Sequence, residues 1–397
     1  MMKQMSPQFS ELDPLSPDRY QMVVRWLVVT SIVMVLGGCA APGPVKPFEG
    51  SEQVATISEE ESRLWVQARD MDSMIRRSGQ IYRDEVLQQY VQQVMEQLYP
   101  EFKGTIRVRV IDSPTLNAFA LPNGSIYFNS GLLARADNEA QLATVLAHEG
   151  AHFVNKHSLQ QRRVIKSRTA FAMGTAIVGV PLADLIAISS IYGFSRDLER
   201  EADAIGYERL RAADYDVRES VKVFEHLYAE VKALDVKQPV FFSSHPKLKE
   251  RIDSFNSLIK VSGQPQGRVG QDVYLEHMRD VRLTSLQTDL SMNRYKSVIL
   301  VLENEVSAKR YASHHRHYYL GEAYRLRDEE GDAKRAETAY KKAIEARDDF
   351  APSYRALGLL YLKKKETEKS QPLFEKYLRL APNAPDRAYI EHYLNKL

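Results

Sequence analysis

The feature that most constrains this chain is a pair of histidines four residues apart in the segment His148-Glu149-Gly150-Ala151-His152. Four residues make about one turn of an α-helix, so a helix here places both imidazoles on one face. Two neutral imidazoles at this spacing can bind one zinc ion. Glu149 then lies beside the open coordination position, where it can accept a proton from zinc-bound water. The pattern therefore predicts a helical metal site with a general base.

A third ligand is expected from the acidic segment Ser195–Asp203, which has a helical pattern. Glu199 and Glu201 could each bind the metal, but they lie about 200° apart around a helix. Asp203 is four residues after Glu199 and shares its face, where its carboxylate can accept the free N–H of a metal-binding histidine. We therefore expect Glu199 to be the third ligand and Asp203 to support a ligand. A solvated acidic helix face is the alternative for this segment taken alone.

The first 38 residues are typical of a signal peptide rather than of a folded domain. An apolar run at residues 26–36 follows Arg25 and is too short to span a bilayer. It ends at Leu36-Gly37-Gly38-Cys39, which resembles a bacterial lipobox, in which the cysteine is lipidated and becomes the first residue. The alternative is a buried helix that ends at a free cysteine. Because the segment before Arg25 is long and acidic for a signal peptide, Met22 is a candidate initiator.

The residues that follow the cysteine bear on localisation. Residue 40 is Ala, whereas an Asp there favours retention in the inner membrane, so the resemblance to lipoproteins implies a lipid anchor in the outer membrane facing the periplasm. Residues 39–57 are rich in Pro and Gly and predict a flexible tether.

Composition narrows the class of protein. The chain has 397 residues, 44% of them hydrophobic, which suits two or three globular domains. The chain has 54 Lys and Arg residues and 52 Asp and Glu residues. Its net charge of +2 therefore gives no sign of the basic surface that binds nucleic acid. The single cysteine, Cys39, excludes an internal disulfide framework and any zinc site built from cysteines.

Secondary-structure signals before the histidines predict helices and a small sheet. Ser58 and Glu61 form a capping box, and a helical pattern continues from there, with breaks, to about Tyr99. Apolar residues alternate with arginines in 105–111, which indicates a half-buried strand. Residues 117–130 predict two further short strands around a Pro-Asn-Gly turn. The fold class is therefore α+β, mainly α.

The rest of the chain is predicted to form two domains joined by a glycine-containing linker. Asn138, with Gln141 three residues later, begins the helix that carries the histidines. We expect a first domain at 58–260 and a linker at 261–270, where three glycines and a proline gather. Residues 271–397 are then an all-α domain.

An internal repeat dominates that last domain. The segment Leu320–Tyr324 matches Leu357–Tyr361 at an offset of 37, and Ala339–Lys342 matches Leu373–Lys376 at an offset of 34. The difference predicts three extra residues in the first unit's turn, near Asp328–Gly331. A period of about 34 with these Gly and aromatic positions resembles the tetratricopeptide repeat. The alternative is an unrelated pair of helical hairpins. The helical pattern before the two units predicts a degenerate repeat or a cap.

Over residues 58–260 the chain resembles the zinc metallopeptidases of the HtpX and CAAX-prenyl-protease type, in particular their periplasmic BepA-like and LoiP-like members. The resemblance rests on Asn117–Pro122, Gly131–Leu133, His148–His152 with His157, Ser195–Asp203, and Ser243-Ser244-His245-Pro246 with Arg251. The chain departs from the family at Gly150, where an aliphatic residue is common, and a glycine there should weaken the helix by about 1 kcal/mol. The resemblance implies a zincin-type domain with a small sheet, followed by the repeats.

The resemblance also implies roles for individual residues. One zinc ion per chain is expected on His148, His152 and Glu199, with Glu149 as the base and Asp203 behind the ligands. Arg196 is expected to help stabilise the oxyanion, and His157, off the ligand face, to be packed or in contact with a ligand. His245 could be a fourth ligand that closes the resting site, could bind substrate, or could only pack against the next helix.

These expectations define a function and its competitor. The chain is expected to be a zinc endopeptidase that degrades misfolded or stalled outer-membrane proteins, with its repeats binding the β-barrel assembly machinery. The strand Ser125–Phe128 could pair with an extended substrate. The apolar stretch Ala170–Gly193 is expected to be a buried or substrate-channel hairpin, with a membrane-dipping segment as the alternative. The competing function is an assembly chaperone or scaffold with a largely idle zinc site.

Overall fold

Three short strands form the small sheet that the sequence predicts. They appear in the computed structural model, which describes residues 44–51, 57–173, 193–234, 248–262, 266–304 and 309–396. The strands are β1 (Arg107–Ile111), β2 (Ala118–Ala120) and β3 (Ser125–Asn129). Val108 and Val110 of β1 are buried while Arg107 and Arg109, which alternate with them, are partly exposed, which confirms the predicted half-buried strand.

The strand order is β1-β3-β2, so β3 is the central strand. It runs parallel to β1, with Val108 opposite Ile126, and antiparallel to β2. The prediction that Ser125–Phe128 pairs with an extended substrate is therefore wrong, because the backbone groups on both sides of β3 already pair with neighbouring strands. Among the residues that the structure describes, no strand pairs with the other edge of β2.

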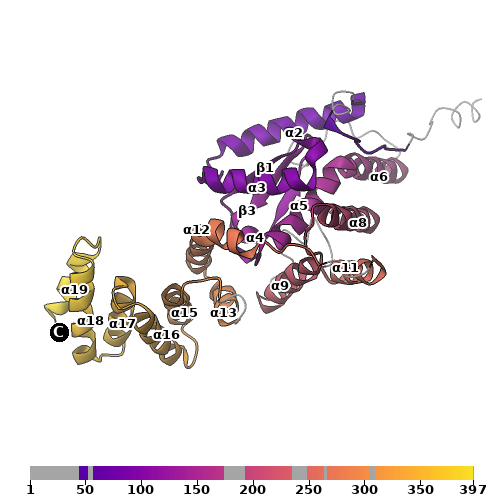
Figure 1. Ribbon diagram of the computed structural model, residues 1–397. Helices are drawn as coiled ribbons and strands as arrows, with labels where there is room; N and C mark the ends of the chain where they lie inside the picture. Colours follow the sequence, from indigo (N-terminus) through magenta and orange to yellow (C-terminus); the bar gives the residue numbers. More distant parts are fainter. Residues whose placement is uncertain are drawn as a thin grey trace, which may run out of the picture. The chain divides into compact units, whose positions relative to one another are not determined.

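Helices make up most of the fold, which confirms the mainly α class (Figure 1). In the described part of the chain before residue 263 they are α2 (Glu59–Arg77), α3 (Glu85–Leu98), the 3-10 helix η2 (Pro100–Phe102), α4 (Ser130–Arg135), α5 (Glu139–Val154), α6 (His157–Met173), α8 (Arg196–Ala212), α9 (Arg218–Leu234) and α11 (Leu248–Ser262). Both predicted N-caps are confirmed. The Ser58 hydroxyl accepts a hydrogen bond from the backbone N–H of Glu61 at 3.3 Å, and the Asn138 side chain accepts one from that of Gln141 at 3.0 Å.

Helix α5, which carries both histidines, runs through the middle of the first domain (Figure 1). Every one of its residues is buried. It packs against β2, α3, α8 and α9, so it has no solvent-facing stripe. The metal-site side chains on this helix are thus held in a closely packed interior, where rotamers are restricted.

Part of the predicted tether packs against this domain. Phe48 is 5% exposed, and its ring contacts those of Trp65 and Phe153. Its backbone N–H donates to the carbonyl of Val154, the last residue of α5, at 2.9 Å. Phe48 is therefore anchored to the end of α5.

The C-terminal helices form hairpins of the predicted kind. They are α12 (Gln271–Ser291), α13 (Tyr295–Glu303), α15 (Ser313–Arg327), α16 (Asp332–Ala346), α17 (Ala351–Lys363), α18 (Thr367–Leu380) and α19 (Arg387–Leu394). A Cβ at Gly321 would lie 2.5 Å from the Tyr340 ring, and one at Gly358 would lie 2.6 Å from the Phe374 ring. Each hairpin thus packs an aromatic ring against a glycine at equivalent positions, as the matched segments predict.

The extra residues of the first hairpin are not all in its turn, so that prediction is wrong. The turn between α15 and α16 is residues 328–331, and the turn between α17 and α18 is residues 364–366. The first turn is longer by only one residue. The other two extra residues lie in the helices. One is at the end of α15, where residues 325–327 correspond to 362–363, and one is at the start of α16, where residues 332–338 correspond to 367–372.

Helix α12 packs into the core of the first domain. Tyr274, Met278 and Val281 belong to the same buried cluster as the α5 side chains. The Tyr274 hydroxyl donates to the carbonyl of Leu133 in α4 at 2.6 Å. Residues of the predicted linker also bond to this domain, since the backbone N–H of Arg268 donates to the carbonyl of Asp214 at 2.8 Å. The boundaries at 261 and 271 stay predictions.

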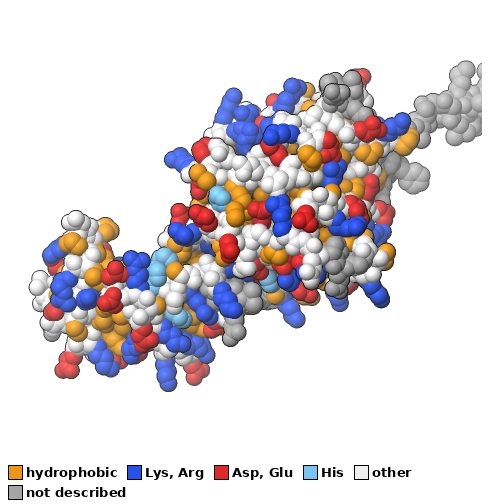
Figure 2. Space-filling view, in the orientation of Figure 1, with side chains coloured by type: hydrophobic (Ala, Val, Ile, Leu, Met, Phe, Trp, Pro, Cys, Tyr) orange, Lys and Arg blue, Asp and Glu red, His pale blue; other side chains and the backbone are white. Residues whose placement is uncertain are grey.

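Several predicted features lie outside the described residues. They are the signal peptide with Cys39, most of the apolar stretch Ala170–Gly193, and His245 with its Ser-Ser-His-Pro segment. Among the residues that the structure does describe, no helix is both long and apolar enough to cross a membrane. Figure 2 shows acidic and basic side chains interspersed over the visible face.

Candidate metal centre

Two helices bring the predicted ligands together. His148 and His152 lie on α5, and Glu199 lies one turn into α8, whose N-cap Ser195 accepts a hydrogen bond from the backbone of Leu198. The helices approach closely at Gly206, where an added Cβ would meet the backbone nitrogen of His148 at 3.4 Å. The small residues of α8 thus let the two backbones come near enough for one carboxylate to reach both imidazoles.

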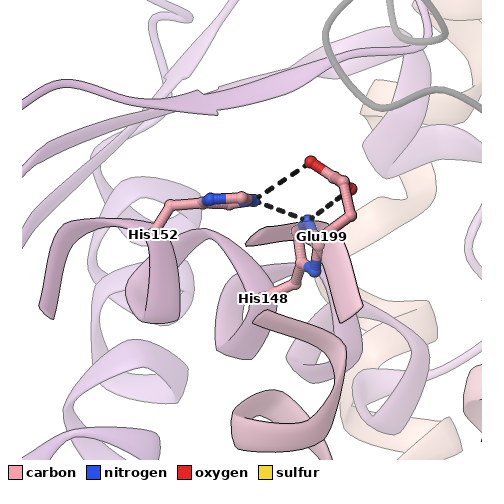
Figure 3. Close-up of side chains that lie close together, drawn as sticks. All are labelled: His148, His152 and Glu199. Carbon is pink, nitrogen blue, oxygen red and sulfur yellow. Dashed lines mark hydrogen bonds and ion pairs between the residues drawn. The ribbon is translucent and has the colours of Figure 1, made fainter. Parts of the chain in front are cut away.

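The three side chains point at a common centre (Figure 3). The Nε2 atoms of His148 and His152 are 3.0 Å apart. The two carboxylate oxygens of Glu199 lie 3.5 Å from these nitrogens, one from each. All three residues are buried. The structure therefore places Glu199, and not Glu201, beside the histidines.

These separations fit a metal ion. Ligands that lie about 2.0–2.1 Å from a tetrahedral zinc ion are about 3.3 Å from one another. The observed values of 3.0 and 3.5 Å fall on either side of that spacing. Two imidazoles and one carboxylate are also the protein ligands of a known class of catalytic zinc site, in which a fourth position stays open.

His148 is supported by an ion pair behind it. Its Nδ1 lies 3.0 Å from Oδ1 of Asp203, which fixes the ring and leaves Nε2 for the metal. Arg251 of α11 donates to the same Oδ1 from Nε at 3.0 Å and from Nη2 at 2.7 Å. The arginine also lies over the Phe224 ring, 4.1 Å from its centroid. Asp203 thus lies close to His148, and Arg251 balances its buried charge. The supporting role of Asp203 stays a prediction.

His152 is supported differently. Its Nδ1 lies 2.8 Å from Nδ1 of His157, the first residue of α6. Phe194 stacks on the His152 ring with centroids 4.0 Å apart and planes at 15°. Burial lowers the pKa of His157 to about 4. Glu201, the rejected ligand, is half-exposed and lies 3.6 Å from Nε2 of His157.

The structure explains why a glycine, and not an aliphatic residue, stands at position 150 inside the motif. A Cβ at this position would lie 2.3 Å from Cε2 of Tyr99. The Tyr99 ring therefore occupies the space that an aliphatic side chain at 150 would need. Its hydroxyl donates to the carbonyl of Ala147 at 2.5 Å, which ties the residue after α3 to the helix of the histidines.

The other predicted residues have separate places. Glu149 is buried next to His148 on α5. Arg196 is the first residue of α8, its side chain is 62% exposed, and its guanidinium lies 4.0 Å from the carboxylate of Glu250. Among the described side chains it is not brought together with the three ligands, so its role at an oxyanion stays a prediction.

Sequence reasoning missed two aromatic residues at this site, Tyr99 and Phe194. A glycine within the helix motif was a signal that some larger neighbour fills its place, but it could not say which. Phe194 precedes the capping Ser195 and carried no recognisable signal. The contact of His157 with a ligand was one of the two roles expected for it.

Comparison with known proteins agrees with this geometry. Residues 82–259 match peptidase family M48, and residues 351–384 match a tetratricopeptide repeat. The mitochondrial metalloendopeptidase OMA1 of Schizosaccharomyces pombe is 34% identical over 149 residues, which cover 36% of this chain and 44% of that protein. The metalloendopeptidase OMA1 of Bos taurus is 27% identical over 225 residues, 53% of this chain and 43% of that protein.

A bacterial relative also matches. The beta-barrel assembly-enhancing protease of Escherichia coli K12 is 23% identical over 253 residues, which cover 59% of this chain and 52% of that protein. The chain spans about half the length of these relatives. The metal-site helices α5 and α8 lie inside the first family match, and the hairpin of α17 and α18 lies inside the second. The chain thus contains a domain of peptidase family M48 followed by a tetratricopeptide repeat.

Proposed function

We propose that this protein is a zinc metalloendopeptidase. The observation that carries the proposal is the convergence of His148, His152 and Glu199 on one buried centre, with Glu149 on the same helix. These residues would hold a zinc ion, which would polarise the scissile carbonyl and make water a stronger nucleophile. Glu149 accepts the proton of the attacking water and passes it to the leaving amine.

The remaining residues of the site hold this arrangement in place. Asp203 keeps the Nδ1 proton of His148 and so leaves its Nε2 lone pair for the ion. Arg251 neutralises that buried carboxylate, which would otherwise be costly away from water. Glu199 contributes the one negative charge among the three ligands, and it faces both imidazoles.

An extended substrate segment would pair with β2, at the edge of the sheet. The backbone N–H of Leu121 donates to the carbonyl of Ser125 at 2.8 Å. The backbone N–H of Asn129 donates to the carbonyl of Asn117 at 3.0 Å. Because hydrogen-bonded pairs alternate along an antiparallel ladder, the backbone groups of Ala120 point away from β3. Helix α5 packs against β2, so a strand added there would lie beside the histidines. Such pairing selects extended, unfolded segments over folded ones.

The cellular setting of the proposal comes from the N-terminus and the relatives. Lipidation of Cys39 would anchor the protein in the outer membrane, with its domains in the periplasm of a Gram-negative bacterium. One relative is named a beta-barrel assembly-enhancing protease. We therefore propose misfolded or stalled outer-membrane β-barrel proteins as substrates, and the assembly machinery as the partner of the repeats.

The decisive experiment replaces Glu149 by Gln in the full chain. We expect the variant to bind one zinc ion per chain and to leave fluorescently labelled casein, an unfolded probe, intact. Glu208→Gln is the matched control, because this carboxylate is exposed on α8 and pairs with Arg211. Cleavage of casein by the Glu149 variant at the wild-type rate would refute the mechanism.

The same variant tests the competing function. Two hairpins with their Gly–aromatic contacts are present, so the repeats could support a chaperone or scaffold without proteolysis. A strain that lacks the gene would be complemented with wild type or with Glu149→Gln. Full complementation by the variant would favour the scaffold, and failure to complement supports the protease.

A further inference from the structure

The contact between His152 and His157 restricts where their protons lie. The two Nδ1 atoms are 2.8 Å apart, which is a hydrogen-bond distance. A hydrogen bond needs one proton between them, so one nitrogen donates and the other accepts. If His152 binds a metal through Nε2, its neutral ring carries the proton on Nδ1. His157 must then be the acceptor, with its own proton on Nε2.

The surroundings agree with this assignment. The Nε2 atom of His157, which would carry the proton, faces the carboxylate of Glu201 at 3.6 Å, an electrostatic contact that is longer than a hydrogen bond. His157 itself is fully buried at 0% exposure. A proton on both nitrogens of His157 would put two N–H groups against each other at 2.8 Å, which is repulsive. The ring therefore faces the ligand with a lone pair.

Two contacts together fix the His152 ring. Phe194 stacks on its face and sets the plane of the ring. Stacking alone still allows the ring to turn by 180° about its Cβ–Cγ bond and return to the same plane. This flip would exchange Nδ1 and Cδ2 and take Nε2 away from the centre. The hydrogen bond to His157 opposes this flip because only Nδ1 can donate to it.

We propose that His157 is a positioning residue that holds His152 in the metal-binding tautomer and orientation. The inference rests on the proposed metal site and extends it to the first residue of α6. The two histidine ligands are then supported in different ways. His148 has a carboxylate paired with an arginine behind it, and His152 has a neutral imidazole. Only the first support adds ionic charge to the site.

The test compares two substitutions of equal shape in the full chain. In His157→Asn the side-chain oxygen occupies the δ1 position and can accept the proton of His152. In His157→Leu a methyl group occupies that position and cannot. Zinc affinity is measured by competition with a chromophoric chelator, and the absorption spectrum of the Co2+ form reports the ligand geometry. Thermal unfolding in excess chelator shows whether each variant folds without metal.

We expect His157→Leu to lose about 10- to 100-fold in zinc affinity and to change the Co2+ spectrum. His157→Asn should stay within about threefold of wild type, because it keeps the acceptor. Equal affinities for Leu and Asn, whether both wild-type or both reduced, would overturn the proposal, since the hydrogen bond would then play no part. If the Leu variant does not fold, His157→Ala takes its place in the comparison. Wild type that binds no zinc would instead refute the proposed metal site.

Discussion

Replacing Gly150 by Ala should destabilise the protein, although the same change stabilises most helices. Alanine is favoured over glycine inside a helix by about 1 kcal/mol. At this position, however, the new Cβ would lie 2.3, 2.7 and 2.9 Å from three atoms of the Tyr99 ring. Carbon atoms pack at about 3.5–4.0 Å, so the ring or the helix must move by about 1 Å.

The magnitude follows from what that movement costs. Overpacking a buried site costs about 1–3 kcal/mol. Moving the ring also weakens the 2.5 Å hydrogen bond from its hydroxyl to Ala147, worth about 1 kcal/mol. Burial raises the pKa of this hydroxyl, so it remains a proton donor across the usable pH range. Against the gain of about 1 kcal/mol in helix propensity, the net loss is about 1–3 kcal/mol.

Urea unfolding of the metal-free protein measures this loss for Gly150→Ala. The same substitution is then made in two altered backgrounds. In Tyr99→Phe the ring remains, so Gly150→Ala should still destabilise. In Tyr99→Leu the clashing ring atoms are gone, and Gly150→Ala should be neutral or stabilising by up to about 1 kcal/mol. Stabilisation by Gly150→Ala in the wild-type background would refute the reasoning.

Three further predictions concern the metal ligands and two residues, Cys39 and His245, that lie outside the described part of the chain. Glu199→Gln should lose most of the bound zinc while Glu201→Gln keeps it, as measured by metal analysis of the purified proteins. Cys39→Ser should give an unprocessed or mislocalised chain, and equal labelling of both forms by a fatty-acid probe would contradict lipidation. If His245 closes the resting site, His245→Ala should raise basal cleavage of casein, whereas lower activity would indicate substrate binding and unchanged activity a packing role.

The elements of this fold were predictable where the signal is local. The capping residues Ser58 and Asn138 mark helix starts because each bonds to a backbone group three residues away. The choice of Glu199 over Glu201 followed from helical periodicity together with the need for a supporting carboxylate, Asp203, on the same face, and the structure places Glu199 beside both histidines. Such inferences need only the geometry of one helix.

Contacts between distant segments were not predictable in the same way. The residues of Ser125–Phe128 are enough to predict a strand. Its position at the centre of the sheet depends on which other segments pair with it. The partner of Gly150 is Tyr99, which comes from an element far away in the sequence. Likewise, only the folded chain shows that α6 begins with an imidazole against the ring of His152.

The helix of the histidines also depends on α12, which follows the predicted linker. Arg135, at the end of α4 and just before α5, is 5% exposed and pairs with Glu230 of α9 at 2.9 Å. It also pairs with Asp289 of α12 at 2.6 Å. Without α12, Arg135 would lose one of its two anions, and breaking a buried ion pair costs about 3–5 kcal/mol. The entry to α5 is therefore held by helices on both sides of the predicted linker, α9 before it and α12 after it.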